Sequence, residues 1–118
     1  MKCELCEQLE RNENILYQDN DVAVVARDYG FASGQVTVFP KQHLTILEMV
    51  ERSLLEKCSS MANKVGIAVF DSLKVQGTNV LIQNGLGAGQ KIPHFSIEVI
   101  PREREDNLLL QWQPQAAG

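Results

Sequence analysis

Long apolar segments and basic clusters are both missing from this 118-residue sequence. Its longest apolar runs fall far short of the roughly 18 residues that a membrane span needs, so we expect no membrane span. The N-terminal stretch MKCELCEQLE contains no apolar h-region, so no signal peptide is expected and a cytoplasmic location is predicted. Lysine and arginine form no cluster and the net charge is -4, which argues against nucleic acid as a partner.

Internal repeats, low-complexity blocks and linkers rich in proline, glycine or serine are also absent from the sequence. The length suffices for one hydrophobic core, and the apolar share of 44% is ordinary for a globular protein. We therefore predict a single domain over residues 1–118. It would begin with a knuckle at residues 1–10 and end with a tail at residues 103–118.

Short apolar runs separated by turn residues predict a sheet. The expected strands cover residues 15–18, 22–26, 35–39, 79–83 and 94–100, and the last is expected to stop at Pro101. Asp19-Asn20-Asp21 is turn material between the first two strands. Five strands and one long helix predict an α+β fold with a mostly antiparallel sheet.

One long amphipathic helix is predicted between the third and fourth strands. Ser53 followed by Glu56 has the form of a capping box, which places the start of the helix there. An apolar stripe follows at helical spacing: Leu54, Cys58, Met61, Val65 and Val69. Cys58 lies on this stripe and is expected to be a small core residue. The helix is expected to lie on one face of the sheet.

The last predicted strand alternates between apolar and polar side chains. Phe95, Ile97 and Val99 are expected to face the helix, because successive side chains of a strand point to opposite faces. The polar set, His94, Ser96 and Glu98, then lines the opposite face, which we expect to be the functional one.

The whole chain contains only two histidines, His43 and His94, together with a CxxC pair, Cys3 and Cys6. Two cysteines and two histidines make a complete tetrahedral zinc shell. The residues alone leave other interpretations open, because a CxxC pair also occurs as buried thiols or as a redox pair.

The segment 84–102, NGLGAGQKIPHFSIEVIPR, resembles the signature of the histidine-triad (HIT) family of nucleotide hydrolases and transferases. That family writes its active-site strand as His-x-His-x-His, and the same register here gives His94, Ser96 and Glu98. The resemblance covers the chain from Cys3 to Arg102. It implies the HIT-like fold and a homodimer.

The resemblance also implies ligands. Some family members bind zinc through a CxxC pair, the histidine of a Pro-Lys-x-His motif and the first triad histidine. Pro40-Lys41-Gln42-His43 provides that motif here, so the resemblance implies a structural zinc held by Cys3, Cys6, His43 and His94. For a purine nucleotide or phosphate ligand, it implies a site that contains Asn84, Gly89, Gln90 and Ser96. Ribose recognition would come from an aspartate; ungapped counting places Arg27 at that position, and Asp28 follows it.

The departures from the family concern its chemistry. The family's nucleophile is the middle histidine, and Ser96 stands in its place; Glu98 replaces the third histidine, and Gln35 replaces another histidine common in the family. A serine needs a neighbouring base, and no third histidine supplies one. We therefore expect a nucleotide- or phosphate-binding protein that lacks the family's hydrolase and transferase activity. Two alternatives stay open: a hydrolase with altered chemistry at Ser96 and Glu98, or an interaction module with a vestigial pocket.

Overall fold

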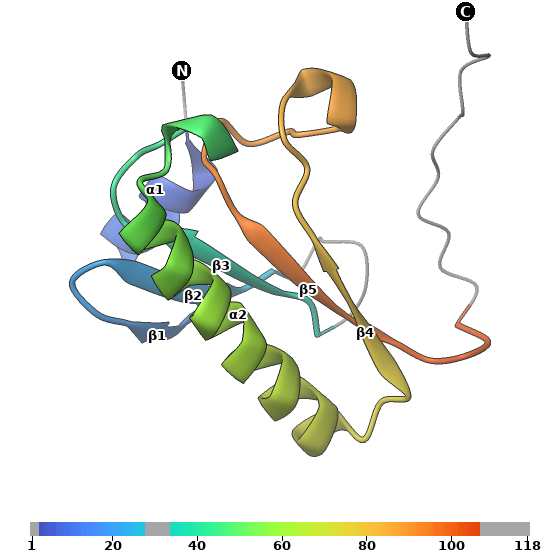
Figure 1. Ribbon diagram of the computed structural model, residues 1–118. Helices are drawn as coiled ribbons and strands as arrows, with labels where there is room; N and C mark the ends of the chain where they lie inside the picture. Colours follow the sequence, from blue (N-terminus) through green and yellow to red (C-terminus); the bar gives the residue numbers. More distant parts are fainter. Residues whose placement is uncertain (1–2, 28–33, 107–118) are drawn as a thin grey trace, which may run out of the picture.

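A five-stranded antiparallel sheet forms the centre of the molecule (Figure 1). The computed structural model describes residues 3–27 and 34–106. The strands are β1 (Ile15–Gln18), β2 (Val22–Ala26), β3 (Val36–Pro40), β4 (Gly77–Leu81) and β5 (Ile97–Arg102), in the spatial order β1-β2-β3-β5-β4. Every neighbouring pair is antiparallel, which confirms the predicted α+β class.

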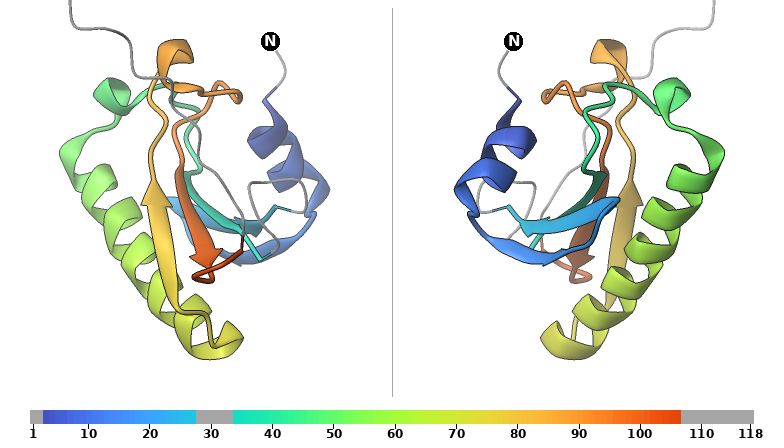
Figure 2. Two further views of the ribbon diagram at one scale, coloured as in Figure 1. Left: turned by 90° about the vertical axis from the view of Figure 1, so that its right-hand side faces the viewer. Right: turned by 90° about the vertical axis from the view of Figure 1, so that its left-hand side faces the viewer.

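Helices cover both faces of the sheet, giving three layers (Figure 2). The long helix α2 (Arg52–Leu73) lies on one face, and the short helix α1 (Glu4–Arg11) lies on the other. Strand side chains alternate between two apolar clusters. The cluster under α2 includes Val24, Val38 and Val99, whereas the cluster under α1 includes Val25 and Phe39. Leu5 of α1 is fully buried in the second cluster.

Helix α2 packs against the sheet through the predicted apolar stripe. Cys58 is fully buried, and burial raises the pKa of its thiol to about 11, as expected of a core residue. The predicted capping box is wrong. The helix begins two residues earlier than that motif requires, its N-cap is Glu51, and no side chain caps it. Its C-terminus is set by Lys74, whose left-handed backbone lets its N–H bond to the Phe70 carbonyl.

The turn between β1 and β2 is held by one carboxylate. Asp19 Oδ1 accepts hydrogen bonds of 2.8 Å from the backbone N–H groups of Asp21 and Val22. These two amides lower the pKa of Asp19, because they stabilise its ionised form. The turn prediction is therefore confirmed, with a mechanism typical of aspartate in tight turns.

The last two strands begin and end at other residues than predicted. Gly77 opens β4, whereas the prediction placed its start at Asn79. Strand β5 begins at Ile97 and includes Pro101, which the sequence pattern treats as its end. Proline fits there because the pairing between β5 and β3 stops at Val99, so its missing N–H removes no bond to β3.

The N-terminal knuckle is helical. Cys3 is the N-cap of α1, and its Sγ accepts a bond of 3.4 Å from the N–H of Cys6. The sequence predicted a knuckle at residues 1–10 but no helix there. Among the described residues, no helix is long and apolar enough to cross a lipid bilayer. Of the predicted tail, residues 103–106 are described, and Asp106 binds Arg102 through a 2.8 Å ion pair.

Candidate functional site

Four predicted metal ligands come together at one end of the sheet. Cys3 and Cys6 come from the start of α1, His43 from the segment after β3, and His94 from the segment before β5. Their donor atoms all lie within 4.8 Å of one another. Nδ1 of His94 lies 3.3 Å from Cys3 Sγ and 3.6 Å from Cys6 Sγ, and Nδ1 of His43 lies 3.4 Å from Cys6 Sγ.

These distances fit a tetrahedral zinc shell. Metal–sulfur bonds of about 2.3 Å and metal–nitrogen bonds of about 2.0 Å place neighbouring sulfur and nitrogen ligands about 3.6 Å apart. The observed separations of 3.3 to 3.6 Å between histidine nitrogens and cysteine sulfurs match this value. The described cysteines are free thiols, so they are available as ligands. The four residues therefore form a possible metal site.

The environment of His94 suits a metal ligand. Its ring is 1% exposed, and Nε2 donates a hydrogen bond of 2.7 Å to the carbonyl of Pro40. That bond assigns the proton to Nε2 and leaves the Nδ1 lone pair directed at the two sulfurs. Burial lowers the pKa of His94, which favours the neutral imidazole that a metal requires. The rings of Phe39 and His94 pack in a T-shaped arrangement, with their centroids 5.2 Å apart.

The thiols need a cation to become thiolates here. Burial, and to a smaller extent the neighbouring Cys3, raise the pKa of Cys6 to about 11. A divalent metal reverses this effect, because a coordinated thiol loses its proton. The backbone N–H of Cys6 that bonds Cys3 Sγ is a further donor for a charged sulfur. The donor set thus matches a metal site better than a pair of inert core thiols.

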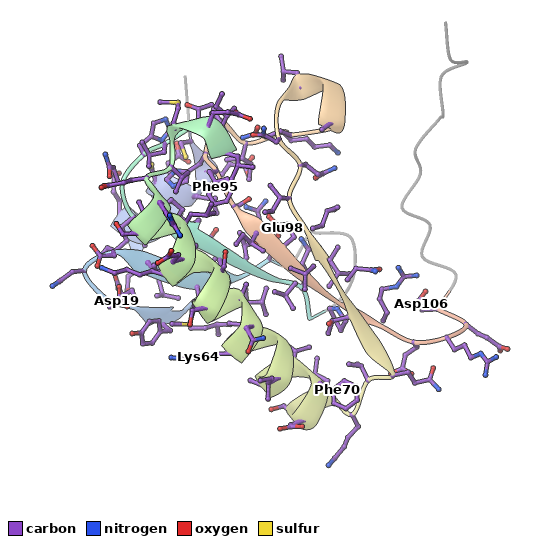
Figure 3. The ribbon with its side chains drawn as sticks, in the orientation of Figure 1. Asp19, Lys64, Phe70, Phe95, Glu98 and Asp106 are labelled. Carbon is purple, nitrogen blue, oxygen red and sulfur yellow. The ribbon has the colours of Figure 1, made fainter. Side chains whose placement is uncertain are left out.

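A second polar group, which we call the Glu98 cluster, consists of Gln35, Thr37, Ser96 and Glu98. Glu98 Oε2 accepts hydrogen bonds from Gln35 Nε2 at 2.7 Å and from Thr37 Oγ1 at 2.6 Å. Glu98 Oε1 accepts one from Ser96 Oγ at 3.1 Å. Thr37 lies directly opposite Glu98 in the β3–β5 ladder. Figure 3 shows Glu98 on β5, in the middle part of the sheet.

The Glu98 cluster occupies the face opposite α2. Phe95, Ile97 and Val99 belong to the apolar cluster under α2, so the alternating side chains of Ser96 and Glu98 point the other way, as predicted. Gln35 is 4% exposed and Thr37 is fully buried, so both donors are held rigidly by their surroundings. The result is a carboxylate fixed by three neutral donors.

The glycine-rich segment 84–90, called the 84–90 loop below, is ordered by its own side chains. Gln90 Oε1 accepts from the Gly85 N–H at 2.7 Å, and its Nε2 donates to the carbonyls of Thr45 and Ile92. Asn84 Oδ1 accepts from the Leu47 N–H at 2.8 Å.

Asn84 Nδ2 donates to Glu48 at 2.8 Å. The side chains of Asn84 and Gln90 thus shape the 84–90 loop, and the backbone N–H groups of Gly85, Ala88, Gly89 and Gln90 are bonded within it.

Gly89 and Gln83 lie against each other in this region. Gly89 has a φ of +89°, and a Cβ atom there would lie 2.8 Å from Gln83 Nε2, so only glycine fits. The β4–β5 ladder ends with Leu81 opposite Glu98. The 84–90 loop therefore begins three residues after the strand position that lies opposite Glu98.

The sequence offers two neighbouring residues, Arg27 and Asp28, for the predicted ribose contact. Asp28 lies outside the described residues. Arg27 is described: its guanidinium is 13% exposed and forms a 3.4 Å ion pair with Glu4 of α1. This contact joins α1 to the end of β2. Arg27, which ungapped counting places at the ribose position, therefore has a structural role.

Two residues in this region, Thr37 and Gln83, are not among the predicted site residues. A threonine two residues after Gln35 in a strand that is otherwise apolar indicates a polar contact on one face. Gln83 is predicted only as the end of a strand. Its contact with Gly89 depends on how the 84–90 loop folds back, and no local pattern announces that.

Comparison with known proteins gives relatives of this chain. It is 29% identical over 93 residues to the adenylylsulfatase HINT3 of Arabidopsis thaliana, a match that covers 79% of this chain and 47% of that protein. It is 30% identical over 73 residues to the asymmetrical bis(5'-nucleosyl)-tetraphosphatase of Schizosaccharomyces pombe, covering 62% of this chain and 40% of that protein. The chain thus spans less than half of the length of both relatives.

Solved structures share the fold. A Zn-bound histidine triad family protein from Mycobacterium smegmatis superposes with a TM-score of 0.84 at 23% identity, covering 98% of this chain and 85% of that one. A HIT family member from Bacillus subtilis gives 0.85 at 24% identity, covering 98% and 84%. The sheet and the two helices described above are therefore those of the HIT fold. A profile of the HIT domain matches residues 8–105, and the chain therefore belongs to the HIT domain family.

Proposed function

We propose that this chain is a nucleotide- or phosphate-binding HIT protein with a structural zinc, and that it lacks the family's nucleotidyl hydrolase and transferase chemistry. The observation that carries the proposal is the hydrogen-bonded Ser96–Glu98 pair at the second and third triad positions. Nucleotide-related names among its relatives, an adenylylsulfatase and a bis(5'-nucleosyl)-tetraphosphatase, support the ligand class.

The electrostatics at Glu98 oppose nucleotidyl transfer. Among the described residues, no basic side chain forms an ion pair with Glu98. Two unit negative charges about 5 Å apart repel by about 3 kcal/mol at an effective dielectric constant of about 20. A phosphoryl group beside Glu98 is therefore destabilised at the position where the family's histidine would attack it. Ser96, which replaces that histidine, has no imidazole beside it as an activating base.

Zinc is the metal that we propose for the Cys3–Cys6–His43–His94 site. Two thiolates and two neutral imidazoles in tetrahedral arrangement are a closed shell typical of structural zinc. The Zn-bound relative from Mycobacterium smegmatis supports this choice. Such a site joins α1 to the two segments that flank β3 and β5, so its binding energy adds to the stability of the fold.

A second candidate function is hydrolysis by Ser96 with Glu98 as its base. The 3.1 Å bond from Ser96 Oγ to Glu98 Oε1 has the geometry of a nucleophile and its base. Gln35 and Thr37 weaken this candidate, because their hydrogen bonds engage the other oxygen of Glu98 and hold the carboxylate in a fixed structural network.

A homodimer is the proposed assembly. Strand β4 is an edge of the sheet, and it faces the viewer in the left view of Figure 2. Beside it, α2 and β4 form a groove of about 580 Å³ whose lining includes Ile67, Phe70, Val80 and Ile82. These side chains are 39% to 59% exposed. An edge strand beside an apolar groove suits a second copy of the chain, which would pair with β4 and cover the groove.

One experiment separates the candidates. The zinc-loaded protein is titrated with AMP and with phosphate by calorimetry, and the same preparation is assayed for hydrolysis of nucleoside phosphoramidates and dinucleoside polyphosphates. Binding without turnover supports the proposal. Turnover that Ser96→Ala abolishes supports the hydrolase. Neither binding nor turnover means that the pocket is vestigial, and the interaction-module interpretation then replaces ours.

A further inference from the structure

The Glu98 cluster places a negative charge at the site proposed for an anion, and this conflict needs a physical resolution. The Glu98 carboxylate accepts hydrogen bonds from three neutral donors, and none of them supplies a positive charge. In the described part of the chain, the ion pairs all involve other carboxylates. A phosphate can therefore approach Glu98 favourably only if a cation comes with it.

We infer that Ser96 and Glu98 hold a magnesium ion that carries the phosphate of the ligand, so that a nucleotide binds here as its magnesium complex. This inference rests on the proposed nucleotide- or phosphate-binding function. Magnesium is typically bound by one or two carboxylates together with substrate phosphates, and it keeps several water ligands. One carboxylate and one neighbouring hydroxyl are therefore sufficient protein ligands for such a site.

The oxygen geometry fits this ion. Adjacent oxygens around an octahedral magnesium at about 2.1 Å lie about 3.0 Å apart. Ser96 Oγ and Glu98 Oε1 lie 3.1 Å apart, so both can reach one ion once the hydroxyl hydrogen turns away. Oε1 accepts only the Ser96 bond, which leaves it a lone pair for the metal, whereas Oε2 is engaged by Gln35 and Thr37.

The buried neighbours of Glu98 fix the position of the ion. Gln35 and Thr37 are buried and donate hydrogen bonds to Glu98 Oε2, so the direction of the other oxygen, Oε1, is fixed. The phosphate and water would complete the coordination of an ion held by Ser96 Oγ and Glu98 Oε1.

The zinc site does not compete for this ion. Its two sulfur ligands prefer zinc over magnesium, whereas a carboxylate and a hydroxyl suit a hard cation. The two metals can therefore be tested separately, provided that no chelator is used and the zinc content is checked in every preparation.

The experiment measures AMP affinity by calorimetry with and without millimolar magnesium. Variants are Glu98→Gln, which keeps the shape and removes the charge, and Glu56→Gln, a matched change at an exposed carboxylate on α2. Wild type and Glu56→Gln should bind AMP at least tenfold more tightly with magnesium, and Glu98→Gln should show no such dependence. Adenosine, which has no phosphate, should be insensitive to magnesium in all three proteins.

A second measurement follows the cation alone. Manganese, a spectroscopic substitute for magnesium, is titrated without nucleotide and detected by electron paramagnetic resonance. Weak binding to wild type that Glu98→Gln abolishes supports the ion site even if no nucleotide binds, and in that case only the proposed function fails. Wild type that binds AMP equally well with and without magnesium, or that shows no manganese binding, overturns the inference.

Discussion

The metal site makes a quantitative prediction about stability. Cys3→Ser is the sharpest perturbation, because serine is also a good N-cap and keeps the acceptor for the Cys6 N–H, yet it is a poor zinc ligand. The variant therefore removes the metal with little other change. We expect about one zinc per chain in wild type and none in Cys3→Ser, measured by elemental analysis of tag-free protein.

The magnitude follows from the length of chain that the metal closes. Cys3 and His94 are 91 residues apart in sequence and 3.3 Å apart in space. A cross-link that closes a loop of about this length stabilises the folded state by about 4 to 5 kcal/mol in the chain-entropy model. Weak metal binding by the unfolded CxxC pair reduces this value, so we expect a loss of about 4 kcal/mol. For a domain of this size, that corresponds to about 15 °C in Tm.

The assay is thermal unfolding followed by circular dichroism, with and without a strong zinc chelator. The chelator should lower the Tm of wild type to that of Cys3→Ser and leave the variant unchanged. Cys58→Ala is the matched control, because Cys58 lies on the buried face of α2, in the other apolar cluster from Cys3 and Cys6. It should lose on the order of 1 kcal/mol and keep its zinc. A metal-free wild-type protein with an unchanged Tm would refute the structural role of the metal.

Three further predictions concern the ligand site and the assembly. Nucleoside phosphoramidates and dinucleoside polyphosphates should not be turned over, because losing a nucleophile commonly lowers rates by several orders of magnitude; robust turnover abolished by Ser96→Ala would contradict this. In magnesium-free buffer, wild type should bind AMP weakly, at about millimolar to high-micromolar Kd, and Glu98→His should bind it more tightly in calorimetry because the repulsion is gone. Val80→Arg should convert the proposed dimer to a folded monomer in sedimentation experiments, whereas an unchanged dimer would place the interface elsewhere.

Much of the fold could be predicted because its signals are local. The strands at residues 15–18 and 22–26 match the prediction, and the hairpin between them follows from one aspartate that bonds two backbone amides. The stripe on α2 follows from helical spacing. The start of α2 was missed because a Ser-x-x-Glu pattern also occurs inside helices, where its side chains cap nothing.

The candidate metal site could be predicted as a set of residues, because the chain has no other histidine and only one CxxC pair. The convergence of His43 and His94 depends on pairing between distant strands, and only the family resemblance pointed to it. The Glu98 cluster could not be predicted in full. Gln35 and Thr37 are neighbours of Glu98 through the β3–β5 register, which no local pattern encodes.

Strand β5 and the residues before it divide the three triad positions between two different tasks. The first position, His94, faces the cysteines and bonds the Pro40 carbonyl, so the fold depends on it. The second and third positions, Ser96 and Glu98, are hydrogen-bonded within the Glu98 cluster. A library randomised at all three positions and selected for folding alone should therefore retain histidine at position 94 and accept many residues at 96. In this architecture, substitutions at the second and third positions can abolish catalysis without being removed by selection for folding.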